Sequence, residues 1–187
     1  MPSTDSDPGA TAPAAARAAF QAALVDEAGR KSSVLWVSVP GNAQPLGAWH
    51  AWVDGAAVVV HEGDEQKLPG LRLTDRVELV LRSKDTAALL VRVPARVVPL
   101  EPGTAAWDAA AGALHAARQS APDGEAQPDR WATASLITRL EPTGDATEAP
   151  GGYDQADRRA APVPSPATTL RARPMVLGRR SRRRPKL

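Results

Sequence analysis

The chain has 187 residues and a formal net charge of +2, and it contains no cysteine. This length is enough for one domain with a sizeable core and hardly enough for two. The lack of cysteine excludes disulfides, thiolate metal sites and a thiol nucleophile. No apolar run approaches the roughly 20 residues that span a bilayer, and the acidic, polar N-terminus does not resemble a secretory signal, so we expect a soluble cytoplasmic protein.

The basic residues are concentrated at the C-terminus. Residues 170–187 carry eight basic residues and no acidic one, whereas the other 169 residues carry 15 basic and 21 acidic residues, a net charge of −6. The folded part should therefore be mildly acidic, which argues against a nucleic-acid-binding domain. The basic tail alone could still bind RNA, DNA or an anionic lipid through counterion release.

The N-terminal part begins with a leader and a helix. Residues 1–12 have the composition of a disordered leader. Residues 13–29 predict a helix, because a proline suits its first turn, alanine favours helix and Gly29 is placed to end it. Phe20 and Leu24 lie four residues apart and indicate a narrow apolar stripe that packs on something larger.

From residue 33 onward the helical period gives way to short, mainly apolar runs separated by turn residues, which is typical of strands, and residues 76–82 alternate cleanly. The predicted strands span residues 33–39, 46–53, 56–61, 76–82, 87–100 and 132–140. Asp54 and Gly55 lie between two apolar runs and predict a hairpin with a type I′ turn, since both central residues of that turn need a positive φ. A second helix, capped by Thr104, is predicted before the last strand.

Six antiparallel strands with these two helices predict a mainly β, α+β fold, a barrel or a sandwich. The elements do not alternate as βαβ units, which argues against a Rossmann fold. We expect residues 13–141 to form this domain. Residues 142–187 are rich in Pro, Ala and Gly and end in the basic run, so we expect a linker and a disordered tail there.

The hairpin has two different faces, because its two-residue turn fixes the register. Trp49 and its neighbours form an apolar core face. The other face carries His50, Trp52 and His61, with the two imidazoles within side-chain reach of each other. This face is either a half-exposed sheet face without a function or a surface for a ligand or a second subunit. A zinc site needs a third ligand, for which Glu62 is the only near candidate. With no cysteine and no His-x-x-x-His spacing, a zinc site is not expected.

A resemblance to a known family rests on two stretches, "VLWVSVPGNAQPLGAWHAWVDGAAVVVHEGDEQKLPGL" and "VELVLRSKDTAALLVRVPARVVPLEPGTAAW". Their strand order, the Pro-rich entry to the second strand, the Asp-Gly hairpin, the lysine after it and the later Arg-Ser-Lys resemble the flavin-binding split β-barrel proteins. These are relatives of pyridoxamine 5′-phosphate oxidase, and they include deazaflavin-dependent proteins of actinobacteria. The similarity covers residues 30–141. It implies a six-stranded antiparallel split β-barrel that forms a homodimer, with FMN or a deazaflavin coenzyme between the two barrels.

The resemblance also implies a set of cofactor-binding residues. They are Lys67, Arg82, Ser83 and Lys84 for the phosphate, and His50, Trp52 and His61 for the ring system. A flavin phosphate carries close to two negative charges and needs cations and hydroxyl or amide donors. The alternative for each of these cations is a solvated surface charge.

The chain departs from the family pattern at several places. "KLPGL" stands where deazaflavin members commonly have an Asn-Leu-Arg-type run, and the signature of the oxidase branch is missing. His61 and Glu62 stand where a Thr or Ser is usual. Glu62, Asp64 and Glu65 place negative charge beside the expected phosphate site.

The function implied by the resemblance is an oxidoreductase that transfers hydride to a small organic substrate, with the cofactor performing the chemistry. The sequence contains no Gly-rich phosphate loop, no G-x-S-x-G motif and no Ser/His/Asp pattern at a recognisable spacing, so no catalytic residue can be named. Two alternatives stay open: a split barrel that binds a cofactor or ligand without turnover, and an interaction protein that acts through its basic tail.

Overall fold

The computed structural model describes residues 11–154 except residues 33, 119 and 121, and for residues 11–14 it describes the backbone only. Most of the predicted leader, and the part of the predicted tail beyond residue 154, lie outside the described residues. Within the described part, no helix has both the length and the apolar character that crossing a membrane requires.

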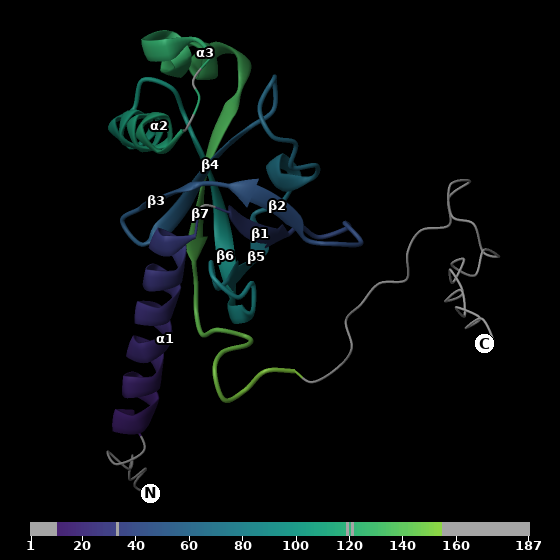
Figure 1. Cartoon of the computed structure of the whole chain (residues 1–187), viewed down its shortest axis with the longest axis vertical. Helices are drawn as coiled ribbons and strands as arrows, with labels where there is room; N and C mark the ends of the chain where they lie inside the picture. Colours follow the sequence, from purple (N-terminus) through teal and green to yellow (C-terminus); the bar gives the residue numbers. More distant parts are fainter. Residues whose placement is uncertain (1–10, 33, 119, 121, 155–187) are drawn as a thin grey trace, which may run out of the picture. The chain divides into compact units, whose positions relative to one another are not determined.

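Seven antiparallel strands form one sheet (Figure 1). They are β1 (Val34–Ser38), β2 (Leu46–Trp49), β3 (Ala51–Val53), β4 (Ala56–His61), β5 (Arg76–Arg82), β6 (Leu89–Leu100) and β7 (Leu136–Pro142). Their order in the sheet is β2-β1-β5-β6-β7-β4-β3. The two outer strands, β2 and β3, are separated along the chain by His50 alone, so the sheet curls into a nearly closed barrel. This confirms the predicted split β-barrel of α+β type, with seven strands instead of six.

The hairpin has the predicted turn but not the predicted first strand. Asp54 and Gly55 have φ angles of 46° and 74°, as a type I′ turn requires. The strand expected over residues 46–53 is interrupted at His50, because β2 pairs with β1 whereas β3 pairs with β4. This change of partner closes the barrel, since a single bent segment supplies both edges of the sheet.

Helix α1 (Thr11–Lys31) continues two residues beyond Gly29, where the sequence predicts its end. It packs on the barrel through Gln21, Val25 and Ala28, which are buried and recur at the spacing of one helix face. Phe20 is off this face and 58% exposed, so the predicted stripe is wrong at that position.

Two apolar cores lie on the two sides of the sheet. The first fills the barrel and reaches α1, and it includes Leu35, Val59, Leu79, Val91 and Leu140. The second lies between the outer face of the sheet and the helices α2 (Ala105–Ala117) and α3 (Gln127–Ala134), and it includes Val58, Val60, Trp107, Leu114 and Trp131. Every residue of β4 is buried, because its side chains alternate between the two cores.

The region between β6 and β7 contains one helix that the sequence predicts and one that it does not predict. Thr104 caps α2 as predicted, since its hydroxyl oxygen accepts from the Trp107 N–H at 3.2 Å. Helix α3 lies partly in a segment expected to be a connection. Pro128 and Asp129 in its first turn are normal for a helix N-terminus. Strand β7 begins at Leu136, four residues later than predicted, because α3 takes up the residues before it.

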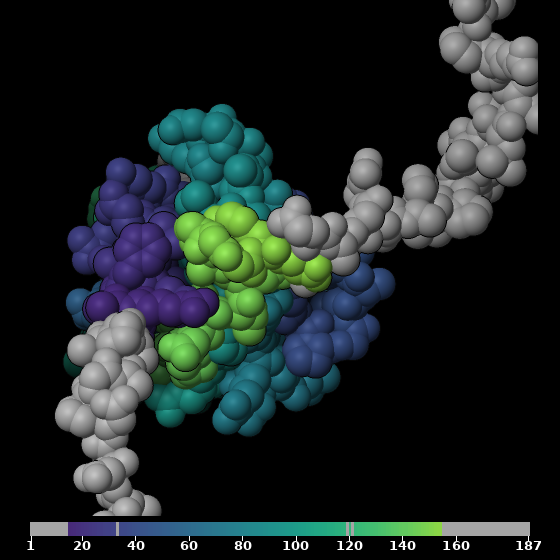
Figure 2. Space-filling view, turned by 90° about the horizontal axis from the view of Figure 1, so that it is seen from below, coloured from purple at the N-terminus to yellow at the C-terminus, as the bar shows by residue number. Residues whose placement is uncertain are grey.

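Residues 143–154 follow β7 and lie beside α1 on the surface of the barrel (Figure 2). The first half of β6 has no β7 partner on this side. The Arg92 N–H donates to the Glu148 carbonyl at 2.8 Å, and the Ala146 N–H donates to Gln21 Oε1 of α1 at 3.3 Å. The ordered domain therefore extends past residue 141, because this segment covers a strand edge whose backbone groups need partners.

Candidate functional site

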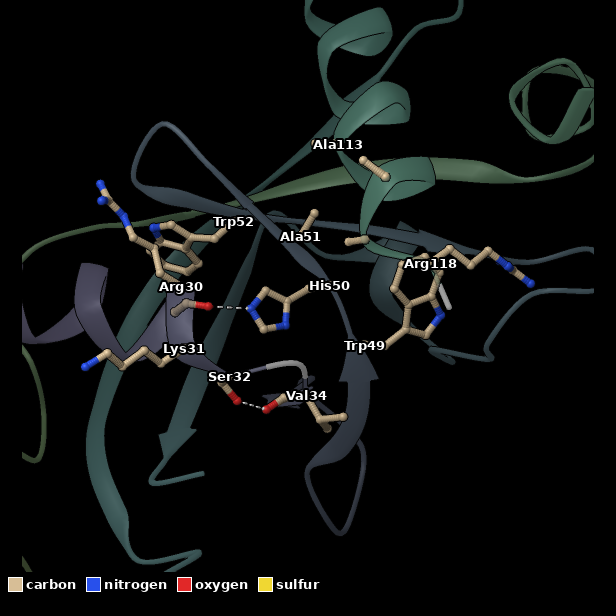
Figure 3. Close-up of a pocket in the computed structure, with 13 residues that line it drawn as sticks. Arg30, Lys31, Ser32, Val34, Trp49, His50, Ala51, Trp52, Ala113 and Arg118 are labelled. Atoms are coloured by element: carbon tan, nitrogen blue, oxygen red, sulfur yellow. Dashed lines mark hydrogen bonds between the residues drawn. The ribbon is translucent and has the colours of Figure 1, made fainter. Parts of the chain in front are cut away.

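A cavity of about 800 Å³ opens between the C-terminal end of α1, the bend between β2 and β3, and the last turns of α2 (Figure 3). Binding sites for cofactor-sized ligands are typically about 300–1,000 Å³. The aromatic side chains that line the cavity are Trp49, His50 and Trp52, and the cationic ones are Arg30, Lys31 and Arg118. The lining contains no carboxylate.

Trp52 forms one wall, and α1 holds its indole from two sides. The indole Nε1 donates to Asp26 Oδ1 at 2.8 Å, and Arg30 pairs with the other carboxylate oxygen at 2.8 Å. The ring also lies against Gly29, where an added Cβ atom would be 2.3 Å from Trp52 Cε3. A glycine is therefore required at this position by the close approach of the indole.

His50 lies at the bend between the two strands and is 5% exposed. Its Nε2 donates to the Gly29 carbonyl at 3.0 Å, near the helix end where carbonyls lack intrahelical partners. The ring meets Trp52 edge-on, with centroids 6.2 Å apart. Burial lowers the pKa of His50 and outweighs the opposite effect of the Gly29 and Ala48 carbonyls. The imidazole is therefore neutral at pH 7.

Trp49 forms the opposite wall and is held through both its backbone and its ring. Gln66 bonds the Trp49 backbone twice: its Oε1 accepts from the N–H at 2.9 Å, and its Nε2 donates to the carbonyl at 3.0 Å. The Arg118 guanidinium lies 5.5 Å from the centroid of the indole. Figure 3 shows this guanidinium directed away from His50, so Arg118 supports the wall from behind.

A second cavity, of about 640 Å³, contains the predicted phosphate residues Arg82, Ser83 and Lys84. It shares three residues with the first cavity, namely Arg30, Lys31 and Ser32 at the end of α1. The structure thus places five of the seven predicted residues on two cavities that share the C-terminal end of α1. For these five, the cofactor-binding role stays a prediction.

The charge of the second cavity is mixed. Its cations are Arg30, Lys31, Arg82 and Lys84, and its carboxylates are Glu27 and Asp85, so cations are in excess by two. Lys31 pairs with Glu27 at 2.6 Å, and the hydrogen bond from this carboxylate raises the pKa of Lys31. Arg82 donates to the Ala87 carbonyl at 2.9 Å.

The other two predicted residues, His61 and Lys67, line neither cavity. His61 is 0% exposed, and its Nε2 lies 3.0 Å from Thr138 Oγ1. Burial lowers the pKa of His61 despite the neighbouring Glu62. Lys67 is exposed and bonds the Gly63 carbonyl. The expectation of one half-exposed face with His50, Trp52 and His61 is wrong, because this side of β4 faces the barrel interior.

Three residues that shape the first cavity were not expected from the sequence: Asp26, Gln66 and Arg118. Asp26 and Arg30 are four residues apart on α1, a spacing that by itself predicts an exposed helix ion pair. Gln66 and Arg118 contact Trp49 from segments distant in the sequence, and no local pattern predicts such contacts. Among the described residues, no three His, Cys, Asp or Glu side chains are grouped so that they could hold a metal ion.

No family model matches the chain, and no curated protein matches it. Solved structures show partial similarity. HutZ, a heme storage protein from Vibrio cholerae, is 13% identical, with 67% of this chain and 94% of that chain covered and a TM-score of 0.47. An FAD-binding protein from Mesorhizobium loti is 15% identical (65% and 89% covered, TM-score 0.45), and a putative pyridoxamine 5′-phosphate oxidase from Listeria innocua is 9% identical (67% and 93% covered, TM-score 0.44). These values do not assign the chain to a family.

Proposed function

We propose that this chain binds a flavin-type cofactor, FMN or a deazaflavin coenzyme, and uses it to transfer hydride to a small organic substrate. The observation that supports this most is the adjacency of the two cavities. One is walled by tryptophans, the other contains Arg82, Ser83 and Lys84, and the end of α1 borders both.

The first cavity fits the ring system of such a cofactor. Trp49 and Trp52 are large, flat and amphipathic, and both are fixed in place by hydrogen bonds or ring contacts. A flat ligand gains from aromatic walls and loses little affinity when these walls are already ordered. His50 is neutral and adds no charge next to an uncharged ring.

The second cavity fits the phosphate. The excess of two cations over carboxylates matches the charge of close to −2 on a phosphate monoester. The Ser83 hydroxyl is a further potential donor, and Arg82 retains guanidinium N–H groups beyond the one that bonds the Ala87 carbonyl. Arg82, Ser83 and Lys84 would hold the phosphate, while Arg30 and Lys31 would face the chain that joins it to the ring.

The cofactor supplies the hydride chemistry when it is bound. The contribution of the described residues is to bind and orient it and to exclude water from one side of the ring. The lining of the first cavity contains one side chain that ordinarily titrates near neutral pH, His50, and its Nε2 proton is donated to a backbone carbonyl. The ring's Nδ1 is buried without a hydrogen-bond partner and is therefore a free acceptor. Because no second side chain of this kind lines the cavity among the described residues, the site offers little proton-transfer chemistry, which favours the second candidate, a barrel that binds the cofactor without turnover.

Binding can be tested without knowledge of the substrate. The full-length protein is titrated with FMN and with the deazaflavin coenzyme, and binding is followed by the change in cofactor fluorescence. We expect binding of at least one of them, and we expect Trp52→Ala to weaken it by roughly tenfold or more, the contribution of one stacked aromatic wall. If the wild type binds neither at high micromolar concentration, the proposed function is wrong.

A further inference from the structure

Glu65 is a buried carboxylate whose contacts lead to the Trp49 wall of the first cavity. Its side chain is 2% exposed. It accepts hydrogen bonds from Arg118 Nη1 at 2.7 Å, from Arg130 Nη2 at 2.8 Å and from Trp131 Nε1 at 2.8 Å. The sequence presents Glu65 as one of three acidic residues that would weaken an anion site. The structure instead uses it inside the protein.

Arg118 transmits this contact to the cavity. Its guanidinium lies near two indoles, 5.5 Å from the centroid of Trp49 and 5.8 Å from that of Trp131. Its Nε donates to the Ser120 carbonyl at 2.7 Å. Hydrogen bonds from two of its nitrogens therefore fix the guanidinium beside Trp49, and a cation–π contact of this kind depends on such a fixed position.

The neighbouring residue acts on the same tryptophan. Gln66 bonds both the N–H and the carbonyl of Trp49 and also donates to the Val60 carbonyl at 3.0 Å. Two consecutive residues of one loop thus hold Trp49. Gln66 holds the Trp49 backbone directly, and Glu65 holds the Trp49 indole through Arg118. If Glu65 served only to attach α3 to the barrel, it would not need to act on the same tryptophan as Gln66.

We propose that Glu65 is a positioning residue for the cofactor: through Arg118 it holds the indole of Trp49 in the orientation that receives the ring system. This inference rests on the proposed function. The ion pairs of the described residues give Arg118 one carboxylate partner, Glu65, whereas Arg130 also pairs with Asp123 and Asp64. Loss of the Glu65 charge therefore releases Arg118, and with it Trp49, more than it releases Arg130.

The first test needs no ligand. The full-length protein is labelled with 5-fluorotryptophan, and the signals of its five tryptophans are assigned from single Trp→Phe variants. We expect Glu65→Gln to shift or broaden the Trp49 signal. Glu78→Gln is the matched control, because Glu78 also pairs with a largely buried arginine, Arg92, but lies on neither cavity. We expect it to leave the Trp49 signal in place.

A second variant guards against a folding failure of Glu65→Gln. Arg118→Gln leaves Glu65 with Arg130 and Trp131, and we expect it to move the Trp49 signal in the same way. If the Trp131 signal moves in Glu65→Gln but the Trp49 signal does not, Glu65 serves only to attach α3, and the positioning role is overturned.

The second test is a double-mutant cycle on FMN affinity. We expect Glu65→Gln to raise the Kd roughly two- to tenfold, the effect of ordering one side chain on binding. In a Trp49→Ala background the same substitution should have no effect, since the wall that it positions is gone. If Glu65→Gln raises the Kd equally in the Trp49→Ala background, the positioning role is overturned. The role is also overturned if the Glu65→Gln variant has wild-type affinity and an unmoved Trp49 signal. A wild type that binds neither FMN nor the deazaflavin coenzyme overturns the proposed function, and the fluorine signals then still decide whether Glu65 orders Trp49.

Discussion

At the scale of single residues, Gly29 sets how closely α1 approaches Trp52. It lies in a helix without a positive φ, so helix propensity alone favours alanine at this position by about 0.5–1 kcal/mol. The contact overrides this preference, because an alanine Cβ would lie 2.3–2.5 Å from three atoms of the indole.

The substitution Gly29→Ala should therefore destabilise the protein by about 1–3 kcal/mol, the usual effect of overpacking, and should also weaken FMN binding by moving Trp52. Gly112→Ala in α2 is the matched control. Its Cβ would meet nothing within 4 Å, so we expect it to stabilise the protein by about 0.5–1 kcal/mol and to leave binding unchanged. Urea denaturation measures both changes. Stabilisation by both substitutions would contradict the close contact of Gly29 with Trp52.

Glu65 gives the protein a predictable sensitivity to acid. Burial alone would raise the pKa of Glu65, but hydrogen bonds from Arg118, Trp131 and Arg130 outweigh it and lower the pKa below its ordinary value of 4.5. The folded state therefore binds this proton less readily than the unfolded state, and the ionised carboxylate contributes stability above the unfolded pKa. That contribution is lost as the pH falls below 4.5 and through the folded pKa.

We expect the free energy of unfolding of Glu65→Gln to fall less steeply with pH than that of the wild type below pH 4.5. Between pH 6 and 8 the difference between the two proteins should be constant, because Glu65 is ionised in both states there. The measurement is a series of urea denaturations from neutral pH down to acid pH. Parallel curves over the whole range would show that the Glu65 carboxylate is not paired in the folded protein.

At the scale of elements, the segment after β7 completes the sheet. It supplies partners to the first half of β6, and Glu148 pairs with the Arg92 guanidinium at 3.1 Å. Ala149 is buried in the first core. Removal of residues 143–154 would leave Arg92, whose side chain is 14% exposed, with one carboxylate partner, Glu78, instead of two.

A chain that ends at residue 154 should melt at the temperature of the full-length protein. A chain that ends at residue 142 should melt several degrees lower, since it loses an ion pair to a largely buried arginine and exposes a strand edge, a loss of about 2 kcal/mol or more. Thermal unfolding followed by circular dichroism compares the three chains. Equal melting temperatures for all three would mean that residues 143–154 add no stability.

The elements that could be predicted from the sequence are those with local signals. The apolar run 56–61 after the turn predicts β4, and the alternation of residues 76–82 predicts β5, both at their observed bounds. Asp54 and Gly55 predict the turn itself. The break at His50 could not be predicted in this way, because it depends on which strands pair when the barrel closes. The sequence does not predict helix α3, although its N-terminal proline is a usable signal. The segment after β7 could not be predicted either, because it binds β6 mainly through backbone groups and therefore has no apolar periodicity.

For the site, the sequence supplied the side chains whose types point to a cofactor, including His50, Trp52 and Lys84. It could not supply their supports, since Arg118 and Gln66 reach Trp49 through tertiary contacts. The sequence predicts His61 on the same half-exposed face as His50, but the face of β4 that carries it lies inside the barrel. Like the strand break, this depends on how the barrel closes.

At the scale of the whole molecule, we propose that the chain forms a homodimer. Val34 and Trp36 of β1 are 45% and 41% exposed, and neighbouring large apolar side chains on a surface commonly mark an interface. Val34 also lines the first cavity, so a second copy bound to β1 would border the cofactor site.

Light scattering at micromolar concentration should give the mass of a dimer for the wild type and of a monomer for Trp36→Lys. Phe20→Lys is the control, because Phe20 is also a large exposed side chain but lies on α1. It should remain a dimer. A wild-type monomer would refute the proposal, and a monomeric Phe20→Lys would place the interface on α1 instead.

We propose that the two cavities bind the two ends of one cofactor. A comparison of FMN with riboflavin tests this claim, because the two ligands differ only in the phosphate. The measurement is the Kd of each ligand by fluorescence titration, for the wild type, for Arg82→Ala/Lys84→Ala and for the control Lys67→Ala, whose side chain lines neither cavity. We expect the wild type and the control to bind FMN roughly ten- to a hundredfold more tightly than riboflavin. This is the contribution of one charge-assisted phosphate contact, about 1.5–3 kcal/mol. The double variant should lose this preference. Equal affinity of the wild type for both ligands, or a preference for FMN that survives in the double variant, would contradict the claim.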